Sequence, residues 1–191
     1  MRIDVVCDIE TLGKGQSPPV FQIAACAFDI KTGELKYSYN QKADIAQMTN
    51  IEGDTLKWWL QTNRELLSNL VGAGSVRECV HPTECDLITR FVLFLNNLKD
   101  QYDEIYFWGN GILFDNRIIS QKCRDYNLVY PIHYRNDRDI RTLLELACIK
   151  TGKTREEFEG ERQSVAHEAL NDALFEKDVI CKAYKAVIDD N

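Results

Sequence analysis

The chain of 191 residues contains no continuous apolar run of the roughly 18 residues that a bilayer crossing requires, so we expect no membrane span. We also expect no secretory signal, because Asp4 and Asp8 interrupt the first apolar residues too early for an apolar signal region. Internal repeats, low-complexity tracts and linker-like stretches are missing as well. These absences favour one domain over residues 1–191.

Basic residues are in the minority, since 23 Lys and Arg stand against 30 Asp and Glu and give a formal charge of −7. A protein that coats nucleic acid needs a dense Lys and Arg surface, so this balance excludes a passive coating protein. A small acidic enzyme can use part of its charge to hold metal ions, and a nuclease is therefore not excluded. The composition, 45% hydrophobic and 28% charged, is that of an ordered globular protein.

The seven cysteines form no Cys-x-x-Cys pair, and several lie inside apolar runs, where a free thiol packs as a small hydrophobe. This usage favours a reducing, cytoplasmic location. Cys79, His81 and Cys85 lie close together in the sequence and could suggest zinc. A fourth ligand at a familiar spacing is missing, so an ordinary loop is the favoured interpretation there.

The hydrophobic periodicity predicts an α/β domain. The first three expected strands are joined by short connections, which favours an antiparallel meander. We expect strands at 3–9, 20–30, 35–39 and 104–108, helices at 54–61, 64–71, 83–98, 114–126, 139–151 and 165–188, a short extended piece at 130–134, and a charged, mobile stretch at 152–163.

Asp8 and Glu10 are the most informative residues of the first strand. Residues i and i+2 of a strand point to the same face, so both carboxylates leave the sheet together. Two acids side by side are unfavourable in a protein interior unless a cation neutralises them, and paired carboxylate oxygens suit Mg²⁺ or Mn²⁺. The alternative is a strand end whose acids simply reach solvent.

Three residues later in the chain could also hold a metal ion or accept a proton. Asp115 follows an expected strand and begins a helix, where it could equally be a dipole cap. His167 and Asp172 are five positions apart, which rotates them by roughly 140° on one helix. They converge on one site only if Asp172 lies on the helix and His167 lies in the segment leading into it. A lone histidine is otherwise more often a surface or core residue.

The combined order Asp-x-Glu, Asp, His-x4-Asp, from Asp8 to Asp172, resembles the DEDDh branch of the DnaQ-like 3′–5′ exonucleases. Segments 8–13, 55–61 and 138–143 are similar to the group that holds phage-type exodeoxyribonucleases, exonuclease VIII and a mycobacterial exoribonuclease. The resemblance implies an RNase H-like mixed sheet, in which a three-stranded antiparallel meander and parallel strands are flanked by helices.

The resemblance also implies two divalent ions, Mg²⁺ or Mn²⁺, and a role for each motif residue. Asp8, Glu10 and Asp172 would hold the first ion, and Asp8 would bridge to a second ion that Asp115 supports. His167 would take the proton from the attacking water, since an imidazole suits base chemistry near neutral pH.

Substrate contacts are expected around this centre. Leu12 could pack on the terminal base, and Trp58 or Trp59 could offer a stacking face, although at least one of the two tryptophans is expected in the core. Arg135, Arg138 and Arg141 form the densest basic group and could contact phosphates, with Asp139 as a helix cap. The predicted substrate-binding residues are Thr11, Leu12, Gly13, Trp58, Asn110, Phe114 and Arg138.

The leading hypothesis is a metal-dependent 3′–5′ exonuclease that acts on single-stranded 3′ ends, favours DNA and releases nucleoside 5′-monophosphates. A 3′–5′ exoribonuclease or short-oligonucleotide hydrolase is the first alternative, because the sequence contains no reliable sugar discriminator. An inactive nucleic-acid-binding module on the same fold and a non-nucleic-acid metallophosphatase are further alternatives. The oligomeric state stays open, and a homodimer is compatible with the sequence.

Overall fold

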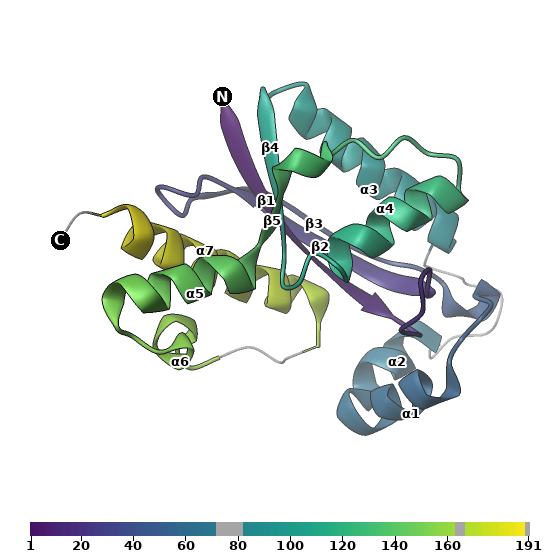
Figure 1. Ribbon diagram of the computed structural model, residues 1–191. Helices are drawn as coiled ribbons and strands as arrows, with labels where there is room; N and C mark the ends of the chain where they lie inside the picture. Colours follow the sequence, from purple (N-terminus) through teal and green to yellow (C-terminus); the bar gives the residue numbers. More distant parts are fainter. Residues whose placement is uncertain (72–81, 163–166, 190–191) are drawn as a thin grey trace.

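A five-stranded mixed sheet forms the centre of the computed structural model, which describes residues 1–71, 82–162 and 167–189 (Figure 1). Its strands are β1 (Arg2–Thr11), β2 (Val20–Phe28), β3 (Leu35–Lys42), β4 (Glu104–Gly109) and β5 (Asp137–Asp139), in the spatial order β3-β2-β1-β4-β5. The first three strands are antiparallel neighbours, while β4 is parallel to β1 and β5 is parallel to β4. The expected meander with added parallel strands is therefore confirmed.

Helices cover both faces of this sheet (Figure 1). On one face lie α3 (Glu84–Lys99) and α4 (Asp115–Asp125), and on the other lie α5 (Ile140–Thr151), α6 (Arg155–Glu159) and the long α7 (Ala169–Ile188). Two more helices, α1 (Gly53–Thr62) and α2 (Arg64–Val71), lie beyond the C-terminal end of β1, and the 3-10 turns are Ile45–Gln47 and Tyr134–Asn136. No helix in the described part of the chain has both the length and the apolar character that a bilayer crossing needs.

The alternation of side chains along β1 decides which helices contact which residues. Val5, Cys7 and Ile9 belong to the core cluster that contains the apolar residues of α3 and α4. Val6 belongs to the second cluster, under α5 and α7. Because successive side chains of a strand point to opposite faces, Asp8 and Glu10 share the face of Val6 and point toward the α7 side.

Two predicted segments differ from the structure. Residues 130–134 contain no strand, and the short fifth strand lies further on, at Asp137–Asp139. Its three residues are all charged, so hydrophobic periodicity gives no sign of it. The stretch 152–163 was expected to be mobile, but it contains α6, whose capping box joins Thr154 and Glu157 and whose Phe158 is buried.

The last helix begins at Ala169 rather than at residue 165, with Glu168 as its N-cap. Residues 163–166 lie outside the described residues. The same holds for Cys79 and His81 of the candidate zinc group, while Cys85 lies exposed on α3.

Helix α3 provides a direct test of the core that holds the sheet. Leu95 is fully buried, whereas Leu93 on the same helix is 55% exposed. Leu95→Ala should lower the free energy of unfolding by about 2–5 kcal/mol, because it leaves a cavity in the core. Leu93→Ala is the matched control and should change it by no more than about 0.5 kcal/mol. Urea denaturation followed by circular dichroism measures both, and equal effects would contradict this placement of α3.

Candidate active site

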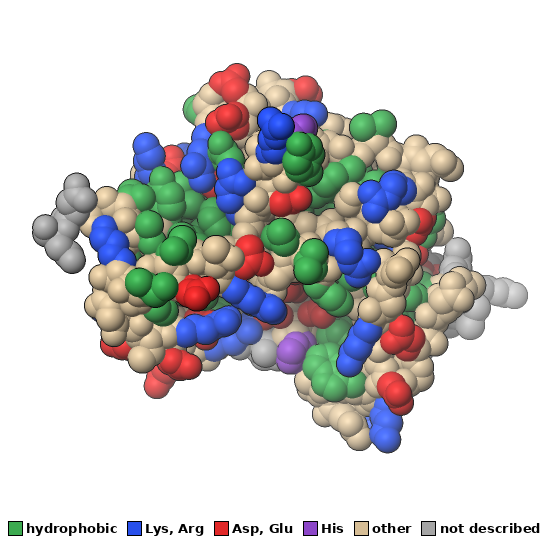
Figure 2. Space-filling model, viewed as in Figure 1, with side chains coloured by type: hydrophobic (Ala, Val, Ile, Leu, Met, Phe, Trp, Pro, Cys, Tyr) green, Lys and Arg blue, Asp and Glu red, His purple; other side chains and the backbone are tan. Residues whose placement is uncertain are grey.

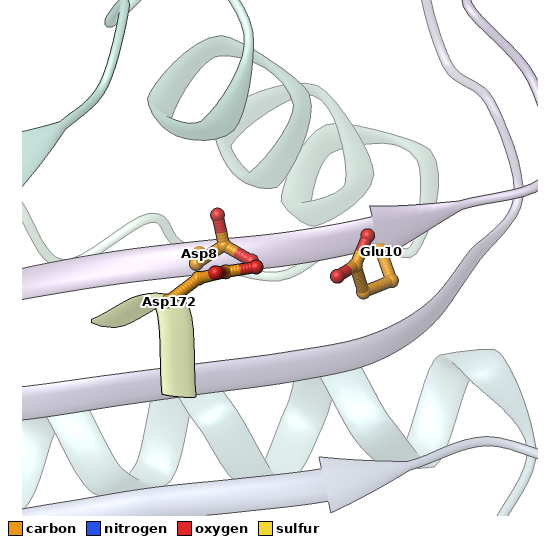
Figure 3. Close-up of side chains that lie close together, drawn as sticks. All are labelled: Asp8, Glu10 and Asp172. Carbon is orange, nitrogen blue, oxygen red and sulfur yellow. The ribbon is translucent and has the colours of Figure 1, made fainter. Parts of the chain in front are cut away.

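Three carboxylates meet where β1 passes the first turn of α7 (Figure 3). Asp8 and Glu10 come from one face of β1, and Asp172 comes from the first turn of α7. One oxygen of each carboxylate lies within 4.8 Å of the others. The structure therefore brings together residues that are more than 160 positions apart in the sequence, in an arrangement that can accommodate one cation.

A difference in strand length leaves room for Asp115 beside this group. The parallel pairing of β1 with β4 ends at Val6 and Trp108, whereas β1 continues to Thr11. Beyond that point the N-terminus of α4 approaches β1, and the Asp115 carboxylate accepts hydrogen bonds from its own backbone N–H and that of Ile9. A Cβ on Gly109 of β4 would lie 2.5 Å from Oδ1 of Asn116, so a side chain there would displace the Asn116 amide in the first turn of α4.

The pKa values of three carboxylates of the site, Asp8, Glu10 and Asp115, are raised. Burial, followed by the charge of Asp115, raises the pKa of Glu10 to about 8, and burial raises the pKa of Asp115 to about 7. The pKa of Asp8 is also raised well above its usual value, first by desolvation and then by Asp115 and Glu10. Desolvation is the largest physical cause, repulsion from neighbouring carboxylates adds to it at Asp8 and Glu10, and a bound cation would offset both.

Glu176 is a fifth carboxylate that the sequence analysis missed. It lies four residues after Asp172, and therefore on the same face of α7, and it is only 7% exposed. Its Oε2 accepts no hydrogen bond from the described residues, although Asn110 donates to its carboxylate. Burial and Asp115 raise its pKa to about 8. The spacing of four from Asp172 was the available sequence signal.

His167 lies immediately before α7, in the segment that leads into the helix. Its backbone N–H donates to Oδ2 of Asp172 over 3.0 Å, which ties the two motif residues together. Desolvation, followed by the charge of Arg162, lowers the pKa of His167 below its usual value. The imidazole is therefore mostly neutral at pH 7 and can accept a proton.

An open cavity of about 700 Å³ lies over the carboxylates. Five of the predicted substrate-binding residues line it: Thr11, Gly13, Trp58, Asn110 and Phe114. Lys14 and Arg141 also line it and provide positive charge at an otherwise acidic site. Figure 2 shows recessed acidic side chains beside a histidine, with Lys and Arg side chains on either side.

Two predicted substrate-binding residues lie elsewhere. Leu12 is fully buried in a cluster with Phe21 and Trp59, so its side chain does not reach the cavity. Arg138 does not line the cavity, because its guanidinium lies 4.3 Å from the centre of the Tyr106 ring and donates to the backbone carbonyls of residues 135 and 137. We therefore correct both expectations, and Arg141 of the same basic group is the arginine at the cavity.

Arg162 is a further cation that the sequence analysis did not single out. Its guanidinium forms an ion pair with Oδ1 of Asp172 and lies 5.0 Å from the centre of the Phe175 ring. Its charge also favours the ionised forms of Asp8 and Glu10. The arrangement as a whole offers hard oxygen ligands, a neutral base and nearby cations, which is the chemistry that phosphodiester hydrolysis needs.

Known proteins resemble this chain in sequence and in fold. An exodeoxyribonuclease of Enterobacteria phage T4 is 23% identical over 207 residues, which cover 95% of this chain and 88% of that protein. The nuclease domain of 3′hExo, a DEDDh family member bound to rAMP, superimposes with a TM-score of 0.63 at 11% identity, covering 96% of this chain and 92% of that one.

Two larger nucleases contain the same fold as part of a longer chain. Cell-death related nuclease 4 and E. coli exonuclease I in complex with a dT13 oligonucleotide both give a TM-score of 0.69 at 14% identity. The chain covers 64% of the former and 41% of the latter. These likenesses establish the RNase H-like exonuclease fold.

The family assignment comes from a match to a family model along almost the whole chain. Residues 3–183 match the model described as the 3′-5′ exoribonuclease Rv2179c-like domain. The chain thus belongs to the Rv2179c-like exoribonuclease domain family and is a 3′–5′ exonuclease.

Proposed function

We propose that residues 1–191 form one catalytic domain that removes nucleoside 5′-monophosphates from single-stranded 3′ ends, with divalent metal ions as cofactors and DNA as the preferred substrate. The observation that carries this proposal is the convergence of Asp8, Glu10 and Asp172 within 4.8 Å, beside a neutral histidine at an open cavity. Such a site suits an unpaired 3′ end, because the terminal nucleotide must leave its neighbours and enter the cavity to reach the recessed carboxylates.

The donor set fits divalent ions of the Mg²⁺ or Mn²⁺ type. Carboxylate oxygens are the ligands that these hard cations prefer, and Oε1 of Glu10 accepts no hydrogen bond from the described residues. Asp8, Glu10 and Asp172 would hold one ion, and Asp8 with Asp115 would hold a second. Ions bound there would lower the pKa of water and offset negative charge on the scissile phosphate.

His167 is the proposed general base. Its imidazole lines the same cavity as the three carboxylates, and its lowered pKa keeps the ring ready to accept a proton near neutral pH. The hydrogen bond from its backbone to Asp172 sets the distance between the base and the carboxylate centre. Base catalysis of this kind contributes about 10²–10⁴-fold to a rate.

The cavity wall suggests how a 3′ end is held. Trp58 is 40% exposed and Phe114 is 38% exposed, so each offers an aromatic face to a base. Lys14 and Arg141 are placed to contact phosphates. The preference for DNA is supported by the phage relative, which is an exodeoxyribonuclease. The family description, an exoribonuclease domain, makes RNA the alternative that the assay below decides.

The expected compartment is the cytoplasm. The six cysteines in the described part of the chain are all free, and three of them are buried. Thiols of this kind persist in a reducing environment.

The proposed activity is tested with 5′-labelled single-stranded DNA and RNA of the same sequence, in Mg²⁺, Mn²⁺ or EDTA. We expect a ladder of shortened labelled products that forms faster on DNA, and that is lost in EDTA and on substrates with a blocked 3′ end. Faster shortening of RNA would replace DNA with RNA as the preferred substrate. Intact substrates under all metal conditions would contradict the proposal.

The stability of the metal-free protein should fall as the pH rises. Glu10 and Glu176, with pKa values of about 8, and Asp115, with a pKa of about 7, bind protons more tightly when folded than when unfolded. Folding therefore loses stability progressively from about pH 4, where unfolded carboxyl groups ionise, to about pH 8. Differential scanning fluorimetry in EDTA should show a Tm that decreases over this interval.

Divalent ions should counteract the loss of stability at high pH. Because a cation competes with protons for the same oxygens, Mn²⁺ should raise the Tm more at pH 8 than at pH 6. Glu10→Gln should flatten the pH dependence in EDTA and reduce the Mn²⁺ effect, whereas Glu65→Gln, at an exposed position of α2, should change neither. A Tm in EDTA that is constant from pH 5 to pH 8 would be evidence against the buried carboxylate cluster.

The role of His167 is tested with a matched histidine variant. His167→Ala should lower kcat by about 10²–10⁴-fold, because the base is removed, and should leave Mn²⁺ binding intact. His133→Ala, at an exposed position before the turn Tyr134–Asn136, should keep wild-type kcat. Single-turnover cleavage and isothermal titration calorimetry with Mn²⁺ measure the two properties. Wild-type turnover by His167→Ala would remove His167 from the mechanism.

A further inference from the structure

His167 has an unusual backbone for a catalytic side chain. Its φ is 61°, in the left-handed region that residues other than glycine seldom occupy. Such a conformation is unfavourable for a residue with a side chain and persists only where neighbouring groups hold it. The structure should therefore contain contacts that fix His167 from outside its own segment.

Two hydrogen bonds hold this backbone from opposite sides. The N–H of His167 donates to Oδ2 of Asp172, which belongs to the following helix. The carbonyl of His167 accepts from Nδ2 of Asn63 over 3.1 Å, across 104 positions of sequence. Asn63 is the C-cap of α1 and leads directly into α2. The second bond thus joins the histidine to a helical pair that carries none of the acidic motif residues.

The side chain of Asn63 is itself oriented by a second bond. Its Oδ1 accepts the N–H of Leu66 over 3.1 Å, at the first turn of α2. With the oxygen fixed on α2, the amide nitrogen faces His167. Both polar atoms of the Asn63 amide thus form hydrogen bonds, Oδ1 as an acceptor and Nδ2 as a donor. Asparagine provides this acceptor and donor on one short side chain.

The same helical pair also encloses the imidazole. The ring of Trp58 meets the His167 ring edge to face at 4.9 Å between centres, and Trp59 does so at 6.3 Å. Trp59 is fixed by the hydrogen bond from its Nε1 to the carbonyl of Thr11, at the end of β1. The wall around the imidazole is thus continuous with the strand that carries Asp8 and Glu10.

We propose that Asn63 is a positioning residue, which holds the His167 carbonyl so that the imidazole keeps its place between the α1–α2 pair and the carboxylate centre. This inference rests on the proposed function for its catalytic consequence, since His167 must act as the base. The geometry of the histidine itself depends on Asn63 whether or not the chain cleaves nucleic acid.

Two variants separate positioning from stability. Asn63→Asp keeps an acceptor for the N–H of Leu66 but has no N–H to donate to His167, whereas Asn63→Ala loses both bonds. Both should lower kcat by about 10–100-fold with KM unchanged within about twofold, because a misplaced base affects the reaction rather than substrate binding. Only Asn63→Ala should also lower the Tm. Asn96→Asp, at an exposed position of α3, is the charge-matched control and should keep wild-type kcat.

A spectroscopic measurement makes the inference independent of turnover. The chain contains three histidines, so the imidazole signals of His167 can be assigned in NMR spectra by their loss in His167→Ala. Both Asn63 variants should shift these signals in metal-free protein and leave those of His133 unchanged. Unshifted His167 signals in both variants, or a kcat that falls only in Asn63→Ala together with its Tm, would overturn the inference. A wild-type protein without nuclease activity would refute the proposed function, while the NMR comparison would still test the role of Asn63.

Discussion

The repulsion among buried carboxylates at the end of β1 is the constraint on which the rest of the site depends. Asp8 and Glu10 must share a face of the sheet because side chains alternate along a strand. The helix α7 packs on that face and adds Asp172 and Glu176. Burial makes ionisation of these carboxylates unfavourable, and the neighbouring charge of Asp115 adds to the raised pKa values of Asp8, Glu10 and Glu176. Such a cluster is tolerable only where the surrounding fold is rigid and cations can enter.

The core on the two faces of the sheet supplies that rigidity. β2 is buried along its whole length, and β1 is paired with both β2 and β4 only as far as Val6. Beyond the end of that pairing, β1 becomes accessible to α4, whose first turn brings Asp115 to the site. The position of the site thus follows from the unequal lengths of two parallel neighbours rather than from any single motif.

The features of the site that depend on a local sequence pattern could be predicted from the sequence. The strand alternation placed Asp8 and Glu10 on one face, and the five-residue spacing showed that His167 and Asp172 converge only if His167 precedes the helix that carries Asp172. The expected helix at 165–188 included His167, whereas α7 begins at Ala169. Residues whose position depends on tertiary packing were harder to predict from the sequence. Leu12 follows β1, yet its side chain packs against Phe21 in the core. Glu176 and Asn63 belong to no recognised motif, and only the approach of α7 to β1 and of α1 to His167 gives them a place at the site.

The distribution of charge explains how an acidic protein can receive a polyanion. The formal charge of −7 is spread over the chain, but several of the acids are gathered at the bottom of the cavity, where bound cations would offset them. Lys14 and Arg141 line that cavity, and Arg162 pairs with Asp172 beside it (Figure 2). A phosphate that approaches the cavity therefore meets positive charge close to the carboxylates. These electrostatics favour a local contact with the end of a strand, which is the contact that exonuclease cleavage needs.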